Sequence, residues 1–193
     1  MAGQGGGPAA ATPDRYQRDG ARAAAAGDEA GHRTLAETER AVADRLDGLA
    51  VDMPAMAVVQ NLYRAAAAIR DHLERSVLAP HGLTWTGWVV LWVVWIWDDI
   101  EARHVAAEAG ISKGTLTGVL TTLEGRGLLR RRTHPSDARR VLVALTPRGA
   151  ELMAELFPRF NAQEGVVTGP LDETDRLALA DMLRTLVREL DQG

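Results

Sequence analysis

The sequence contains no cysteine, and this absence removes several classes of site at once. Without thiols the chain can form no disulfide framework, no cysteine-based zinc site and no thiol redox sensor. The five histidines are scattered along the chain without close ligand spacing, so we expect neither a metal site nor a cofactor. The sequence also offers no pairing of a nucleophile with a base and no phosphate-binding glycine loop, which argues against an enzyme.

Long apolar segments are scarce as well. The first thirty residues lack the apolar core of a signal peptide. The most apolar stretch, WTGWVVLWVVWIW over residues 85–97, is shorter than the ~20 residues that a membrane span needs. It is apolar nearly all round, so we interpret it as a helix buried on every side within a globular protein. These features predict a cytoplasmic protein that makes no membrane contact.

Charge is distributed unevenly along the chain. The whole sequence carries 22 basic and 26 acidic residues, a formal net charge of −4. Residues 111–149 nevertheless contain eight basic and two acidic side chains, so this segment carries +6 and the remainder carries −10. A basic segment within an acidic protein indicates a local surface for anions, of which nucleic acid is the leading candidate.

Helical signals dominate the first half of the chain. Residues 1–33 are rich in glycine and alanine and are expected to form a disordered tail. Apolar residues at helical spacing predict helices over 34–49 and 55–79, separated by a break at Pro54. Thr84 is expected to cap the tryptophan-rich helix, in which four tryptophans share one face: Trp85, Trp88, Trp92 and Trp95.

The basic segment has the pattern of a helix-turn-helix followed by a β-hairpin. A short helix over 101–109 ends at Gly110, and Ser112 caps a second helix that closes near Gly125. Two strands, 128–133 and 139–145, flank the turn HPSDA, and two further helices follow, the first running to about Gly165. The fold class expected is mainly α-helical with a small β-hairpin wing, a winged helix-turn-helix.

Particular motifs in this segment are similar to those of one known family. They are the S-x-x-T start of the second helix, the L-E-x-x-G-L junction into the first strand, the D-x-R element at residues 137–139 and the L-T-x-x-G sequence at residues 145–149. In this order they resemble the winged helix of MarR-family transcriptional regulators. The resemblance covers roughly residues 55–190.

The resemblance implies a homodimer that binds double-stranded DNA at a pseudo-palindromic operator. It implies dimerisation helices at 34–80 and 147–193 around a DNA-binding domain at 81–146. It also implies a repressor that is released by a small, often aromatic, effector. In helix-turn-helix proteins the start of the second helix reaches base edges, and arginines of the wing suit phosphates. We therefore predict DNA contacts from Ser112, Lys113, Gly114, Thr115, Thr117, Arg130, Arg132, Arg139 and Arg140, with Asp137 pairing with Arg139 to orient it.

Two interpretations remain open from the sequence. The tryptophan face could line an effector pocket, with Trp88, Trp92, Tyr63 and His72 as candidates, or it could serve only for packing. The winged helix could also be a protein-interaction module that binds no DNA.

The second helix departs from the family pattern at Gly118, where many members carry an arginine that approaches DNA. Together with Gly114, this glycine predicts an unusually pliable helix in the free protein.

Overall fold

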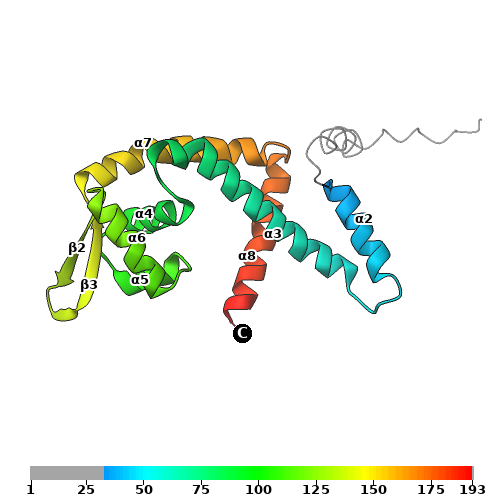
Figure 1. The fold of residues 1–193 in the computed structure, drawn as a ribbon, viewed down its shortest axis with the longest axis horizontal. Helices are drawn as coiled ribbons and strands as arrows, with labels where there is room; N and C mark the ends of the chain where they lie inside the picture. Colours follow the sequence, from blue (N-terminus) through cyan, green and yellow to red (C-terminus); the bar gives the residue numbers. More distant parts are fainter. Residues whose placement is uncertain (1–32, 193) are drawn as a thin grey trace, which may run out of the picture. The chain divides into compact units, whose positions relative to one another are not determined.

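A computed structural model describes residues 33–192, so the predicted disordered tail falls, up to residue 32, outside the described residues. The chain divides into two units between Val58 and Val59, and each is considered separately. Figure 1 shows the helices and strands along the chain.

The first unit contains helix α2 (Leu35–Leu46) and the start of α3 (Met53–Leu73). A capping box fixes the start of α2, since Glu37 N donates to Thr34 Oγ1 and Thr34 N donates to Glu37 Oε2. The helix ends three residues before the predicted end, ahead of Gly48, whose φ is +79°. The predicted break at Pro54 was wrong: this proline lies in the first turn of α3, where its missing N–H costs nothing.

In the second unit, α3 widens after its last residue and then narrows to a 3-10 turn before the tryptophan-rich helix. A π-helical segment (Glu74–Leu78) and a 3-10 turn (Ala79–His81) follow α3, and Gly82 at φ +62° reverses the chain. Helix α4 (Trp85–Trp97) then begins with Thr84 as its cap, as predicted, because Gly87 N donates to Thr84 Oγ1.

The core of this unit forms around α4. Val90, Leu91 and Val94 are fully buried among side chains of neighbouring helices, including Leu73, Leu78, Met153 and Leu156. The prediction that α4 is buried on every side was wrong in two places: Val89 and Trp92 in its middle are only partly buried, and its last turn is exposed. Ile96 and Trp97 are 51% and 62% exposed because the helix ends there at the surface. Among the described residues, no single helix is long and apolar enough to cross a membrane.

A short helix-turn-helix follows α4. Helix α5 (Ala102–Glu108) turns at Gly110, with φ +63°, into α6 (Lys113–Gly125), which Ser112 caps through Thr115 N. These bounds match the predicted pair of helices to within a residue or two. Arg126, at the end of α6, donates to the carbonyl oxygens of His81 and Gly82, which ties this helix to the chain entering α4.

The wing is a three-stranded antiparallel sheet rather than the predicted two-stranded hairpin. Strands β2 (Leu129–His134) and β3 (Asp137–Leu145) form the hairpin, which projects beyond the neighbouring helices in Figure 1. Strand β1 (Ile100–Glu101) pairs with the other edge of β3, opposite Val143 and Leu142. A strand of two residues has no alternation to detect, so the sequence pattern assigned Glu101 to the helix instead.

Two helices complete the unit, α7 (Pro147–Thr168) and α8 (Glu173–Asp191). The first turn of α7 packs tightly against the segment that joins α6 to β2, since a Cβ atom at Gly149 would overlap the carbonyl oxygen of Leu128. Helix α7 passes through Pro158 and ends a turn beyond Gly165, and Asp172 caps α8 by accepting from Asp175 N.

Candidate nucleic-acid interface

Helix α6 has one buried face and one exposed face. Leu116, Leu120 and Leu123 are at most 3% exposed and hold the helix against the core. The exposed side carries every predicted contact residue of this helix, namely Ser112, Lys113, Gly114, Thr115 and Thr117. The structure therefore brings all five together on one accessible surface at the start of α6.

The threonines of α6 use their hydroxyl protons within the helix. Thr117 Oγ1 donates to the carbonyl oxygen of Lys113 at 2.9 Å, and Thr121 Oγ1 donates to that of Thr117 at the same distance. Their oxygen atoms retain lone pairs that can accept further hydrogen bonds, and their methyl groups lie on the exposed face of the helix. The face thus combines acceptors and methyl groups with one ammonium group.

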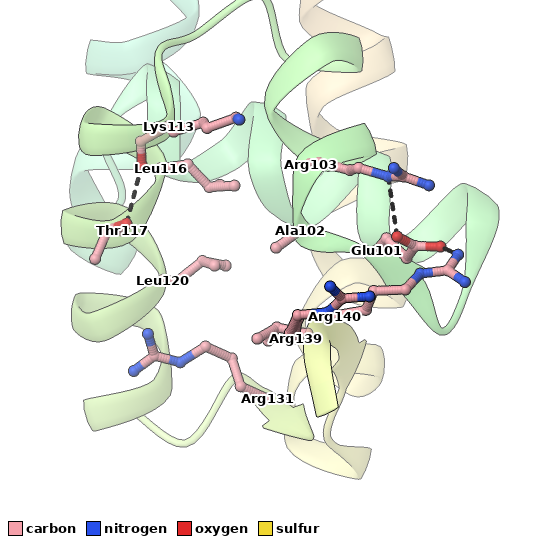
Figure 2. Close-up of a pocket in the computed structure, with 11 residues that line it drawn as sticks. Glu101, Ala102, Arg103, Lys113, Leu116, Thr117, Leu120, Arg131, Arg139 and Arg140 are labelled. Carbon is pink, nitrogen blue, oxygen red and sulfur yellow. Dashed lines mark hydrogen bonds and ion pairs between the residues drawn. The ribbon is translucent and has the colours of Figure 1, made fainter. Parts of the chain in front are cut away.

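A groove of about 440 Å³ lies between α6, the start of α5 and the wing. Leu116 and Leu120 belong to its apolar lining, which Figure 2 shows flanked by basic side chains of the two helices and of the wing hairpin. The charged residues that line this groove are Arg103, Lys113, Arg131, Arg139, Arg140 and Glu101. With Glu124 and Asp137, which pair with Arg131 and Arg139 beside the groove, five cations meet three carboxylates, so the surface keeps a net positive charge that attracts anions.

Glu101 is the acidic residue that lines the groove, and its carboxylate forms ion pairs with two of the arginines. Its side chain is only 10% exposed, and it forms ion pairs with Arg103 Nε at 3.0 Å and with Arg140. Glu101 occupies the N-cap position of α5 but makes no capping hydrogen bond with its side chain. The carboxylate is instead directed to the two guanidinium groups, which connects the helix-turn-helix to β3.

The predicted ion pair in the wing is present. Arg139 Nε donates to Asp137 Oδ1 at 3.1 Å, and Arg139 N donates to the same oxygen at 3.0 Å. These hydrogen bonds hold the pKa of Asp137 below its usual value. Arg139 itself remains 91% exposed, so its guanidinium group is free to meet a further anion while Asp137 limits its directions.

Arg131 lines the groove but was not among the DNA contacts predicted from the sequence. It lies on β2 opposite Val143 and forms a salt bridge with Glu124 of α6, with Nη2 2.5 Å from Oε2. Hydrogen bonds from Arg131 hold the pKa of Glu124 below its usual value. Strand alternation contained the signal, since the buried Leu129 places residue 131 on the side of the strand that faces α6.

The same alternation takes Arg130 and Arg132 away from the groove. Arg132 Nη2 lies 2.6 Å from Asp99 Oδ2, in a salt bridge that joins β2 to the segment between α4 and β1. Its hydrogen bonds hold the pKa of Asp99 below its usual value and raise the pKa of Arg132. Arg130 is exposed. Of the predicted wing arginines, the structure therefore brings Arg139 and Arg140 to the groove but not these two.

The predicted effector residues separate into two groups. Trp88 and Trp92 line a hollow of about 240 Å³ between α4 and α7, together with Trp85, Val89, Phe157, Phe160 and Glu164. The rings stack in pairs, Trp88 on Phe160 at 4.5 Å and Trp92 on Phe157 at 4.8 Å between centroids.

Tyr63 and His72 do not line this hollow. Tyr63 is 74% exposed, and His72 Nε2 lies 2.9 Å from Gln163 Oε1. Within residues 33–192 no group of three or more acidic or histidine side chains is arranged to hold a metal ion.

Comparison with known proteins places this geometry in a family. Residues 83–141, which span α4, the helix-turn-helix and most of the wing, match the MarR family model. The HTH-type transcriptional regulator YwaE of Bacillus subtilis is 30% identical over 162 residues, which cover 82% of this chain and 95% of YwaE. The regulator TtmR of Methylorubrum extorquens is 33% identical over 126 residues, 65% of this chain and 64% of TtmR.

Solved structures agree on the fold. The regulator BpsR of Bordetella bronchiseptica, whose DNA binding is regulated by 6-hydroxynicotinic acid, is 27% identical with a TM-score of 0.59. That match covers 68% of this chain and 98% of BpsR. NadR, solved in complex with 4-hydroxyphenylacetate, is 27% identical with a TM-score of 0.58 and is covered to 91%, against 67% of this chain. The chain belongs to the MarR family of winged helix-turn-helix, DNA-binding transcriptional regulators.

Proposed function

We propose that this protein is a repressor in which α6 contacts the bases of an operator and the wing binds the flanking phosphates. The observation that carries the proposal is the groove, where five cationic side chains from α5, α6 and the wing converge beside the exposed start of α6. The start of a helix carries unpaired N–H groups and a partial positive charge, which add to the attraction for phosphates. Arg139, exposed and directed by Asp137, is the wing contact that we expect to matter most.

In this proposal Lys113, Thr115 and Thr117 contact the base edges. Lys113 supplies donors for guanine O6 and N7, and the methyl groups of Thr115 and Thr117 suit the methyl group of thymine. Gly114 and Gly118 add no side chain, so the DNA can approach the helix backbone closely at these positions.

Lys113 gives a direct test because it is the single lysine in the chain. The intact protein should bind its own upstream DNA more tightly than unrelated DNA, and bound DNA should protect Lys113 from an amine-reactive reagent. Unrelated DNA at the same concentration is the control, and the α-amino group provides an internal reference for reactivity. Equal labelling of Lys113 with and without DNA, or no preference for any upstream fragment, would favour the protein-interaction alternative.

A dimer is the second part of the proposal. Helix α8 buries no residue within the described part of one chain, and it exposes a row of large apolar side chains: Leu177, Leu179, Met182, Leu186, Val187 and Leu190. Such a patch on a helix marks a protein interface, and a second copy would place two reading helices on half-sites one DNA turn, ~34–36 Å, apart. Sedimentation should give a dimer, and Met182→Glu should shift it toward monomer, whereas Glu189→Gln should not.

Release by a small molecule is the third part. The hollow between α4 and α7 is lined almost wholly by aromatic rings, and two structural relatives were solved with, or are regulated by, small aromatic compounds. Helix α4 continues through Asp98 and Asp99 into β1, which pairs with the wing, so a shift of α4 would be transmitted to the reading surface. A compound that binds the hollow should lower operator affinity, and retention of full affinity at saturating compound would refute this part.

A further inference from the structure

The aromatic hollow between α4 and α7 has a charge that distinguishes possible ligands. Among the described residues that line it, Glu164 is the one charged side chain, and no arginine, lysine or histidine is present. Glu164 follows Phe157 and Phe160 at helical spacing on α7, so its carboxylate lies at the same side of the helix as these rings. Its Oε2 accepts a hydrogen bond of 2.9 Å from Asn161 Nδ2, which is neutral and leaves the negative charge in place.

The rings themselves favour positive charge. The faces of tryptophan and phenylalanine carry negative potential, and a cation over such a face gains about 0.5–2 kcal/mol according to its exposure. Trp85, Trp92 and Phe157 are only partly buried, so ring surface remains accessible from the hollow. An organic anion placed here would meet both this potential and the charge of Glu164, and no cation in the lining would compensate.

We infer that the hollow binds small organic cations, of the alkylammonium or aryl-ammonium class, in preference to aromatic acids. The inference rests on the proposed effector function of this site and assigns the chemical class of its ligand. The carboxylate of Glu164 faces the ammonium group, and the tryptophan and phenylalanine rings surround its alkyl substituents. A volume of about 240 Å³ limits the ligand to a small molecule.

Tryptophan fluorescence measures binding directly when Trp97 is first replaced by phenylalanine. Trp97 is 62% exposed and does not line the hollow, whereas Trp85, Trp88 and Trp92 do. In this background we expect benzyltrimethylammonium to cause a saturable change in emission, with weaker binding by the neutral benzyl alcohol and by 4-hydroxyphenylacetate. Because the Glu164 carboxylate is exposed to solvent, Glu164→Gln should weaken the cation about two- to five-fold.

Two further variants make the test specific. Glu164→Lys should abolish binding of the cation, and Glu155→Gln, which removes an acidic residue from the same helix outside the hollow, should leave it unchanged. Tighter binding of 4-hydroxyphenylacetate than of benzyltrimethylammonium would overturn the inference, as would unchanged cation affinity in Glu164→Gln or the absence of a saturable response.

Operator binding is measured in parallel to separate the two ideas. If benzyltrimethylammonium binds in a Glu164-dependent way without releasing the operator, the ligand class is supported and the effector function fails. If 4-hydroxyphenylacetate binds more tightly and releases the operator, the effector function holds and the inferred ligand class is overturned.

Discussion

Glu101 at the start of α5 and Arg140 on β3 form an ion pair that fastens the helix-turn-helix to the wing. The carboxylate is nearly buried, whereas the arginine side chain is 36% exposed at the edge of the groove. Glu101 therefore does not cap α5 with its side chain, and its carboxylate joins the start of this helix to β3 instead.

Replacing Glu101 with glutamine should loosen this connection. The loss of one carboxylate leaves both Arg103 and Arg140 without their charged partner. We expect the free energy of unfolding in urea to fall by about 1–2 kcal/mol, given the partial exposure of both arginines. Glu108→Gln on the same helix is the matched control, since this residue is exposed. Identical urea midpoints for Glu101→Gln and the unmodified protein would show that the pair does not stabilise the fold.

Arg139→Ala should weaken operator binding by at least ~1 kcal/mol without changing stability. The Arg139 side chain is 91% exposed, so it contributes little to packing. If it meets a phosphate, the slope of log affinity against log salt should fall by ~0.9. Fluorescence anisotropy with labelled operator at several salt concentrations measures both quantities. Arg159→Ala on α7, also exposed, is the control, and an equal loss in that variant would argue for a nonspecific charge effect.

Gly118→Ala should stabilise α6. No atom lies within 4 Å of a Cβ built at this position, so alanine fits freely and improves helix propensity by up to ~1 kcal/mol. Amide exchange over residues 112–124 should slow, which tests whether the helix is pliable when free. Gly149→Ala provides the contrast, because its Cβ would overlap the Leu128 carbonyl oxygen and should lower the melting temperature. Exchange in α6 as slow as in its neighbouring helices before any substitution would contradict the predicted pliability.

Acid should release the Asp99–Arg132 salt bridge. Hydrogen bonds from Arg132 lower the pKa of Asp99 in the folded protein. The salt bridge therefore contributes its full stability above the usual aspartate pKa of ~3.9. This contribution is lost as the pH falls through the lower pKa of the folded state. Asp99→Asn should remove this part of the pH dependence while tolerating the left-handed backbone, since φ is +26° there.

The neighbouring Asp98→Asn is the control for this acid effect. Asp98 has a similar positive φ, and Asp99 N donates to its Oδ1, an acceptor that asparagine keeps. Urea unfolding from pH 7 to pH 2 should therefore distinguish the two variants. A pH profile for Asp99→Asn that coincides with that of the unmodified protein would show that the salt bridge does not affect stability.

Residues close together in the sequence were sufficient to predict the helix starts, one ion pair and the family. Thr84 and Ser112 begin helices as expected, because each hydroxyl accepts from the backbone N–H three residues ahead. Thr146 and Asp172 begin α7 and α8 in the same way. The ion pair between Asp137 and Arg139 also follows from nearness in the sequence. The order of motifs was enough to indicate the MarR family.

Contacts between distant residues were decided by the tertiary structure. The pairing of β1 with β3, the ion pair of Glu101 with Arg140 and the ion pair of Asp99 with Arg132 all join segments that are separated by loops or helices. Sequence periodicity reports which face of one element is apolar, whereas a salt bridge depends on where two elements meet. The sequence by itself therefore determined the helices, the wing and the family, and only packing determined which charges face the groove and which remain paired beside it.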